Sequence, residues 1–222
     1  MSAPSLTSLN FDPLAAPYRW LEYLTFGPFL HRTRVHFLPQ LASCRSALVL
    51  GDGDGRFTAE LLAFSPEIRI HAVDVSPAML RMLARRSDLH ASRITTAVAD
   101  LRDWTPNPQS RYDLIATHFF LDCLSTPEVT ALVQRLTPVT APNALWLVSD
   151  FATPPTIFGR LIAAPLVSCL YFAFRLFTGL AVRQLPDHTA GLRTCGWNLQ
   201  SEASRLNGLL IAELWQLIKR GI

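Results

Sequence analysis

The sequence contains almost no lysine, and its basic residues are not gathered into blocks. Only Lys219 among the 20 Lys and Arg residues is a lysine, and the formal net charge is only +3. A surface that binds nucleic acid needs many basic side chains on one face or along one helix. We therefore expect a small-molecule substrate and no nucleic-acid partner.

Cysteine is also scarce. The four cysteines, Cys44, Cys123, Cys169 and Cys195, are far apart in the chain and form no C-x-x-C pair. This spacing excludes a disulfide framework and a cysteine-based zinc site, and it suits a reducing compartment. Residues 1–17 lack the basic start and apolar core of a signal peptide. The expected location is cytoplasmic.

No hydrophobic run is long enough to cross a membrane. The most apolar run, Leu161 to Phe174, is bracketed by Arg160 and Arg175 and contains Pro165. A transmembrane helix needs about 20 consecutive apolar residues. We predict that this run belongs to an apolar helix near residues 157–178 that does not span a bilayer.

Apolar residues are abundant. Hydrophobic residues make up 50% of the 222 positions and charged residues 17%, which argues against disorder and allows one well-buried α/β domain. No repeat or low-complexity segment divides the chain, so we predict a single domain over residues 1–222. Its four parts are an N-terminal helical cap (1–40), a ligand-binding core (41–150), an apolar helical cap (151–192) and a C-terminal β-hairpin (193–222).

Short apolar strands alternate with helices through the middle of the chain. Ser76 and Pro77 are expected to open one helix as N-cap and first helical residue, and Pro127 opens another. Alternation at this spacing indicates βαβ units and a parallel sheet covered on both faces. The predicted strands are 47–50, 69–73, 94–98, 113–117 and 145–148.

The last part of the chain has a different pattern. Residues 198–205 and 209–218 are predicted to be two strands joined around Asn207 and Gly208. The dipeptide Asn-Gly between two strands is among the strongest signals for a hairpin. An antiparallel pair is therefore expected after the parallel strands.

A glycine-rich turn follows the first predicted strand. Gly51, Gly53 and Gly55 allow a tight turn whose backbone can approach a ligand closely. The helix after this turn directs its N–H groups, with their partial positive charge, toward that ligand. A dinucleotide-binding G-x-G-x-x-G would need its third glycine at position 56, where the chain has Arg56. The G-x-G-x-G spacing therefore disfavours a nicotinamide cofactor.

An aspartate ends the second predicted strand. A carboxylate at the place of Asp74 can accept hydrogen bonds from both hydroxyls of an adenosine ribose. The stretch from Val73 to Leu80 reads V-D-V-S-P-A-M-L. Two further stretches come later in the chain. Ala99-Asp100-Leu101 directly follows the third predicted strand, and Tyr112 to Cys123 includes the fourth.

These four stretches, in this order, resemble the motifs of class I S-adenosylmethionine (SAM)-dependent methyltransferases. The resemblance covers residues 45–150 well and the C-terminal hairpin in outline. It implies a Rossmann-like, doubly wound α/β fold with a seven-stranded sheet, mostly parallel with an antiparallel C-terminal hairpin strand. It also implies SAM as cofactor and S-adenosyl-L-homocysteine (SAH) as product. The cofactor-binding residues that it implies are Gly51, Asp52, Gly53, Gly55, Phe57, Asp74, Val75, Met79, Asp100, Leu101, His118 and Phe119.

One position departs from the family pattern. The family often has an acidic residue two places before the first glycine, where this chain has Val49. In the family that acid usually helps to hold the ammonium group of the methionine part of SAM. We hypothesise that Asp52 or Asp54 takes its place.

Catalysis with SAM needs few catalytic groups from the protein, because the cofactor carries its own leaving group. The protein mainly aligns the acceptor with the methyl group and excludes water, and a hydroxyl or acidic carbon acceptor benefits from a general base. We expect His118 either to be that base, because histidine titrates near neutrality, or to hydrogen-bond the cofactor or a loop carbonyl. Asp122 is expected to orient His118, to act as the base itself, or to cap the next helix.

No metal site is expected. Asp122 and Asp150 follow the fourth and fifth strands, as the Mg²⁺ ligands of catechol-type methyltransferases do, but no accompanying Asp-Asn pair appears. His188 falls in the connection before the hairpin. We interpret it as a solvated loop residue rather than as a group that closes over the substrate.

The composition of the two predicted caps gives information about the molecule that accepts the methyl group. Residues 15–37 are predicted to be helical and aromatic, and residues 157–178 helical and apolar. Core packing accounts for about half of these side chains, and the excess favours a lipophilic or aromatic small molecule methylated at oxygen or carbon. Contact of the apolar segment with a membrane surface or a partner subunit stays open, as does a monomer against a homodimer. Two other functions also stay open, a non-catalytic SAM- or SAH-binding protein and a nicotinamide-dependent oxidoreductase.

Overall fold

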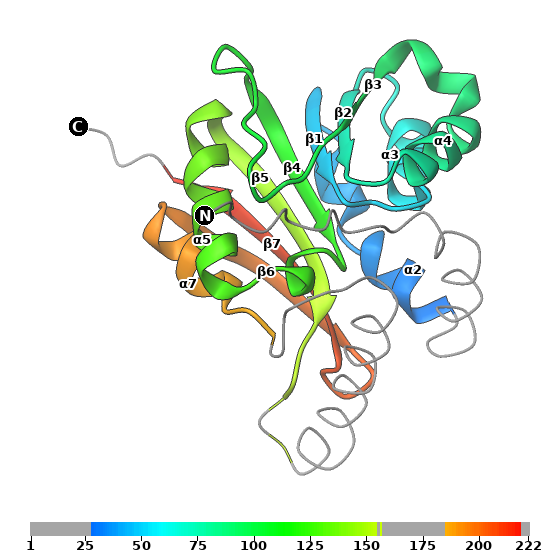
Figure 1. Ribbon diagram of the computed structural model, residues 1–222. Coiled ribbons are helices and arrows are strands. Elements are labelled where there is room, and N and C mark those ends of the chain that lie inside the picture. Colours follow the sequence, from blue (N-terminus) through cyan, green and yellow to red (C-terminus); the bar gives the residue numbers. More distant parts are fainter. Residues whose placement is uncertain (1–27, 155, 157–184, 219–222) are drawn as a thin grey trace, which may run out of the picture.

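The computed structural model describes residues 28–154, 156 and 185–218 (Figure 1). Most of the expected N-terminal cap and the whole apolar segment 157–178 lie outside the described residues. Within the described ranges, no helix has both the length and the apolar character needed to cross a bilayer.

A seven-stranded mixed sheet forms the centre of the molecule, with strand order β3-β2-β1-β4-β5-β7-β6. The first five strands pair in parallel, and β7 pairs antiparallel with both β5 and β6. This arrangement confirms the predicted doubly wound α/β fold with an antiparallel C-terminal hairpin. The strands are β1 (Ser46–Leu50), β2 (Arg69–Asp74), β3 (Ile94–Val98), β4 (Tyr112–His118), β5 (Thr140–Phe151), β6 (Trp197–Arg205) and β7 (Leu210–Leu217).

Helices cover both faces of the sheet, with α3 and α4 on one side and α5 and α7 on the other (Figure 1). Successive residues of a strand point to opposite faces. Leu48 and Leu50 of β1 therefore join the apolar cluster under α5 and α7, whereas Ala47 and Val49 join the one under α3 and α4. The α-helices are α2 (Pro28–Arg34), α3 (Arg56–Phe64), α4 (Pro77–Arg86), α5 (Thr126–Leu136) and α7 (His188–Thr194), and the 3₁₀ turns are η2 (Leu38–Leu41), η3 (Asp88–Arg93), η4 (Leu121–Cys123) and η5 (Thr137–Val139).

Two helices begin where the sequence predicts. The Ser76 hydroxyl accepts a hydrogen bond from the backbone N–H of Met79 at 3.2 Å, and α4 starts at the next residue. At α5 the Glu128 carboxylate accepts a hydrogen bond from the Ser125 backbone N–H at 2.8 Å, which completes a capping box. Ser125 is therefore the N-cap of α5, and the expected alternative of a cap from Asp122 is wrong.

The C-terminal hairpin turns at the predicted place. Leu206, Asn207 and Gly208 have φ angles of 51°, 53° and 89°, a left-handed conformation that Asn and Gly tolerate best. β7 then returns antiparallel along β5 and carries its residues past the carboxyl ends of the parallel strands. Side chains of the hairpin strand β7 thereby reach the edge where a ligand would bind.

Candidate functional site

The carboxyl ends of the parallel strands form one edge of the sheet. The chain winds outward from β1 through β2 to β3 and then resumes at β4 on the other side of β1, so the sheet has a switch point between β1 and β4. Open α/β sheets bind ligands in the crevice outside the strand ends at such a point. The glycine-rich turn, Asp74, His118 and Asp150 all lie at this edge, at or near the ends of β1, β2, β4 and β5.

The three glycines of the turn have different surroundings, although all have positive φ angles of 58° to 79°. A Cβ atom on Gly55 would lie 2.6 Å from Cγ of Leu83, so this glycine permits close packing of the turn on α4. A Cβ atom on Gly51 would lie 2.6 Å from the ring of Phe120. Gly53 has nothing nearer than the Met79 sulfur at 3.9 Å. Its backbone is therefore the part of the turn that is open to a ligand.

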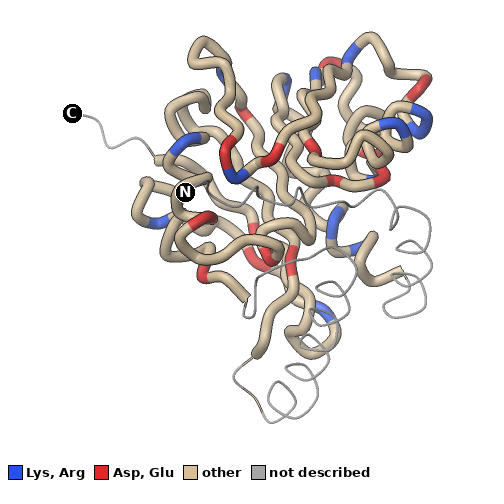
Figure 2. Tube along the Cα trace, in the orientation of Figure 1, with Lys and Arg blue, Asp and Glu red and all other residues tan. Residues whose placement is uncertain are grey.

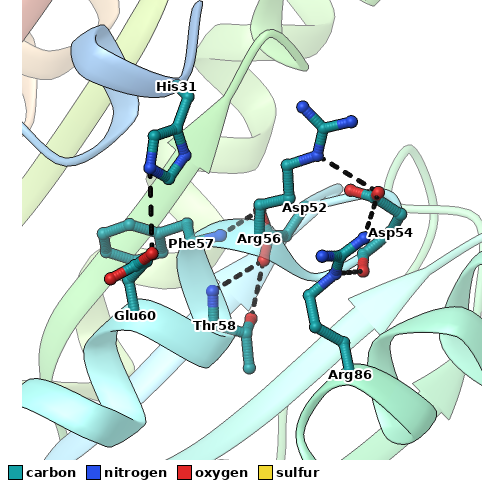
Figure 3. Close-up of polar contacts among 8 residues, drawn as sticks. All are labelled: His31, Asp52, Asp54, Arg56, Phe57, Thr58, Glu60 and Arg86. Atoms are coloured by element: carbon teal, nitrogen blue, oxygen red, sulfur yellow. Dashed lines mark hydrogen bonds and ion pairs between the residues drawn. The ribbon is translucent and has the colours of Figure 1, made fainter. Parts of the chain in front are cut away.

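Asp52 closes the N-terminus of α3. Its carboxylate accepts hydrogen bonds from the Thr58 backbone N–H at 2.9 Å, the Thr58 hydroxyl at 2.7 Å and the Phe57 backbone N–H at 3.4 Å (Figure 3). Burial raises the pKa of this carboxyl to about 6, against the lowering effect of the Thr58 hydrogen bonds. The helix N-terminus thus already holds an acceptor from the protein itself.

Asp54 points to the other side of the turn. Its carboxylate forms ion pairs with Arg86 at 2.7 Å and with Arg56 at 3.2 Å (Figure 3). Both aspartates that the sequence offered in place of the family acid are therefore engaged with protein groups. The Val49 side chain itself is fully buried in the core under α3 and α4.

Asp74 is buried at the end of β2, next to the open part of the glycine turn. Its carboxylate accepts a hydrogen bond from the Ser76 backbone N–H at 2.9 Å. Burial raises the pKa of Asp74 to about 6, although hydrogen bonds from the Ser76 and Gly53 backbone act in the opposite direction. Val75 is half-buried and Met79 is buried beside the turn. The Asp74 carboxylate therefore lies against the Gly53 backbone of the glycine turn.

Asp100 lies in the loop after β3, where the resemblance places it. Its carboxylate is bound by the Arg102 guanidinium and accepts a hydrogen bond from the Arg102 backbone N–H at 3.0 Å. Arg102 lowers the pKa of Asp100, which is therefore ionised near neutral pH. Leu101 beside it is buried in the core under α5.

His118 ends β4 in a fully enclosed position. Its side chain is 2% exposed, its ring centroid lies 4.2 Å from that of Phe57, and neither ring nitrogen has a hydrogen-bond partner among the described residues. Burial and the nearby charge of Arg34 lower the pKa of His118 well below its usual value. Burial therefore opposes protonation of His118, and no hydrogen bond between Asp122 and its ring is present among the described residues.

Asp122 instead meets Asp150. The backbone N–H of Asp122 donates to the Asp150 carboxyl at 3.2 Å, and the Phe151 N–H donates to the other oxygen at 2.8 Å. Burial raises the pKa of Asp122 to about 6, while burial together with the charge of Asp122 raises the pKa of Asp150 much further. The two neighbouring buried carboxyls thus raise each other's resistance to ionisation, and the pKa of each lies above its usual value. Figure 2 shows acidic residues close together where β4 and β5 end.

Arg34 is a site residue that the sequence did not single out. It ends α2, its side chain is buried, and its guanidinium carbon lies 5.0 Å from the ring centroid of Phe119. Phe119 follows β4 with a φ angle of 52°, and its ring also packs 5.2 Å from that of Phe151. Nothing in the local sequence distinguishes this arginine from the others, since only the tertiary contact of α2 with the strand ends buries it.

His188 also differs from its interpretation as a solvated loop residue. It is the first residue of α7 and is buried, and its Nε2 lies 2.8 Å from the Glu213 carboxylate. Glu213 also accepts a hydrogen bond from the Trp215 indole N–H at 2.8 Å. Glu213 belongs to β7. This contact could therefore be predicted only once β7 had been placed beside β5.

The described residues contain no group of three or more His, Cys, Asp or Glu side chains arranged to hold a metal ion. Asp122 and Asp150 meet as a pair, and burial raises the pKa of both carboxyls.

Comparison with known proteins agrees with this geometry. The sequence profile of a family described as a methyltransferase domain matches residues 47–143, from the first strand to the beginning of β5. Residues 47–143 are therefore similar to a methyltransferase domain. The matched range includes the glycine turn, Asp74, Asp100 and the end of β4, so the resemblance based on these motifs is confirmed.

Curated relatives match about half of the chain. Trans-aconitate 2-methyltransferase from Methylobacterium radiotolerans is 33% identical over 127 residues, which cover 56% of this chain and 46% of that protein. Polyamine aminopropyltransferase 2 from Bacillus anthracis is 24% identical over 147 residues, which cover 54% of this chain and 41% of that protein. The matched part therefore spans less than half the length of these relatives.

Solved structures share the fold of this chain at low sequence identity. An O-methyltransferase family protein from Burkholderia thailandensis superposes with a TM-score of 0.69 at 14% identity, covering 92% of this chain and 59% of that one. The N-methyltransferase NodS from Bradyrhizobium japonicum, in complex with SAH, superposes with a TM-score of 0.64 at 16% identity, covering 94% and 93%. These likenesses support the fold.

Proposed function

We propose that this protein is a SAM-dependent methyltransferase that transfers a methyl group to a small, lipophilic or aromatic molecule at oxygen or carbon. The observation that carries the proposal is the meeting of the open Gly53 backbone with the buried Asp74 carboxylate at the switch point of the sheet. This pair has the chemistry that an adenosine needs, namely a close backbone approach and an acceptor for ribose hydroxyls. It lies in a domain whose family match is to methyltransferases.

The other residues proposed to contact the cofactor lie at the same carboxyl edge of the sheet. Asp74 would accept hydrogen bonds from the ribose hydroxyls, and Val75, Met79, Asp100 and Leu101 would hold the adenine. His118 and Phe119 would contribute to holding the amino-acid part. Asp100 is held by Arg102, so its contact with the adenine amine requires Arg102 to share or release it. When bound, SAM supplies a methyl group activated by its sulfonium, and the chain's residues position it.

Asp122 is the proton acceptor in this proposal. A general base works best when its pKa lies near the operating pH, and paired titratable groups with separated pKa values mark acid and base roles. The pKa of Asp122 is raised to about 6, and Asp150 beside it keeps its proton to higher pH. A hydroxyl acceptor placed against Asp122 would lose its proton to that carboxylate while the neutral Asp150 adds no second negative charge. His118, neutral and enclosed, serves the cofactor rather than the proton transfer.

The proposed acceptor class rests on the composition of the apolar segment. The names of two relatives refer to trans-aconitate and to a polyamine, whereas the apolar residues of 157–178 favour a lipophilic molecule. A non-catalytic protein that binds SAM or SAH is the second candidate, and the replacement of the usual acid by Val49 favours it.

Titrations of SAM, SAH and NADH into the purified protein test the proposal. Binding of SAM and SAH supports it, and a screen of phenols, quinones and acids for methyl transfer then separates the enzyme from a binding protein.

A further inference from the structure

The loop after β3 is tied firmly to its surroundings on both sides of Asp100. The backbone N–H of Ala99 donates to the Asp74 carbonyl at 3.0 Å, which joins the loop to the end of β2. Leu101 is buried in the core, and its carbonyl accepts a hydrogen bond from the Arg135 guanidinium of α5 at 2.7 Å. The backbone of Asp100 is therefore held at a fixed point beside the end of β2.

The Asp100 carboxylate is fully engaged by one other residue. Its Oδ1 accepts hydrogen bonds from the Arg102 backbone N–H at 3.0 Å and from the Arg102 Nε at 2.9 Å. Its Oδ2 accepts from the same Nε at 3.1 Å and from a terminal nitrogen of the guanidinium. An ionised carboxylate has about four acceptor sites. Arg102 alone therefore uses the hydrogen-bonding capacity of Asp100.

This ion pair can open at little cost. The Arg102 side chain is 34% exposed and the Asp100 side chain 36%, and ion pairs as open to water as this one are weak. The hydrogen bonds to Asp100 raise the pKa of Arg102, and the charges of Glu128 and Asp103 act in the same direction. Arg102 therefore has other carboxylates near it when it leaves Asp100, whereas the backbone of Asp100 stays in place.

An adenine amine and a guanidinium need the same partner. Both groups are hydrogen-bond donors, and Asp100 is the acceptor that each would use. The amine can bind only after Arg102 has released at least one carboxylate oxygen. A ligand that needs a less populated state of the protein binds more weakly by the fraction of molecules in that state.

We propose that Arg102 competes with the adenine amine for Asp100 and thereby sets the affinity and the base selectivity of the cofactor site. The inference rests on the proposed function, which supplies the adenine. A base with a carbonyl in place of the amine does not need a free acceptor, because its oxygen can accept a hydrogen bond from the guanidinium. Arg102 therefore lowers the preference for adenine over such a base.

The test compares two ligands that differ at this position of the base. SAH carries the 6-amino group of adenine, and S-inosyl-L-homocysteine carries a 6-oxo group instead. Calorimetric titrations of both ligands are made with wild type, Arg102→Ala and Arg102→Gln, of which Arg102→Gln keeps most of the side-chain length without the charge. The control is Arg111→Ala, at an exposed arginine of the same β3–β4 connection whose guanidinium donates to backbone carbonyls of Pro108 and Ser110. Thermal unfolding of each variant without ligand reports on folding.

We expect both Arg102 variants to lower the Kd of SAH by about 5-fold, the upper range for an exposed ion pair. The Kd of S-inosyl-L-homocysteine should stay unchanged or rise, and Arg111→Ala should follow wild type. Removal of an arginine thus tightens binding, which a merely structural role of Arg102 does not predict. In Asp100→Asn, which has no carboxylate to release, the added Arg102→Ala should change the Kd of SAH by less than about 2-fold.

An unchanged or higher Kd of SAH in the Arg102 variants would overturn the inference and leave the proposed function intact. Equal tightening of both ligands, or the same gain in the Asp100→Asn background, would also overturn it. SAH binding by Arg102→Ala where wild type shows none would support it. Absence of SAH binding in wild type and in both Arg102 variants would overturn the proposed function and the inference together.

Discussion

The backbone N–H of Asp122 donates a hydrogen bond to the carboxyl of Asp150 at 3.2 Å, which joins the loop after β4 to the end of β5. Both side chains are buried, at 8% and 3% exposure. Two carboxyl groups enclosed together cannot both ionise cheaply, so the fold favours the protonated form of Asp150. The pair therefore links stability to pH and supplies a group whose pKa suits proton transfer.

The first prediction concerns stability against pH. Asp52, Asp74 and Asp122 have pKa values raised to about 6, and that of Asp150 is raised further. A carboxyl with a raised pKa in the folded state contributes stability that is fully present below its unfolded value near 3.8 and is lost as the pH rises through the folded value. These groups therefore lower the free energy of unfolding progressively as the pH rises from about 4 to about 7.

Asp150→Asn removes the largest of these pH-dependent contributions. The melting temperature of the ligand-free variant should change less between pH 5 and pH 8 than that of wild type. Asp88→Asn, at an exposed aspartate of η3, is the matched control and should follow wild type. Parallel pH profiles for Asp150→Asn and wild type would contradict the assignment of a raised pKa to Asp150.

The second prediction separates two glycines of the same turn. In Gly55→Ala the new Cβ would meet Leu83 at 2.6 Å and the positive φ angle would be strained. The free energy of unfolding should fall by about 3 kcal/mol through overpacking and strain together. Gly53→Ala has room for the methyl group and should lose only about 1 kcal/mol, but it should weaken SAH binding. Chemical denaturation and calorimetry on both variants measure the two effects, and equal destabilisation would contradict the different surroundings of the two glycines.

The third prediction distinguishes the two candidate bases, using whichever acceptor the screen identifies. Asp122→Asn should lower the turnover number by about 10²-fold or more, the range for loss of a general base, and should abolish the rise of turnover with pH near 6. The Kd of SAH should change little. His118→Ala should show the reverse pattern, with weaker SAH binding and a smaller loss of turnover. A large loss of turnover in His118→Ala with normal SAH affinity would return the role of base to His118.

Local signals in the sequence account for the parts of the fold that were predicted. The glycine turn, the N-cap Ser76 and the Asn207-Gly208 hairpin each depend on a few adjacent residues with special backbone or capping chemistry. β5 is the strand whose length was underestimated. It begins at Thr140 rather than near Leu145, because pairing of Thr140 with Tyr112 extends it through a polar stretch that has no apolar pattern.

The candidate site could be predicted only where its residues follow strands. The end of a parallel strand can be located in the sequence, so Asp74 and His118 were placed at the correct edge. Contacts between distant elements could not be foreseen in this way. Arg34 reaches Phe119 only because α2 crosses the strand ends, and His188 reaches Glu213 only because β7 returns beside β5.

Binding of SAH to wild type and to Asp74→Ala tests the central claim most directly. Calorimetry on both proteins, with Asp88→Ala as the matched exposed control and melting curves to confirm folding, isolates the buried carboxylate at the end of β2. We predict that wild type and Asp88→Ala bind SAH with a Kd on the order of micromolar, and that Asp74→Ala weakens binding by more than about 10-fold because the ribose hydroxyls lose a charged acceptor. Absence of SAH binding to wild type, or equal binding by a folded Asp74→Ala, would contradict the account.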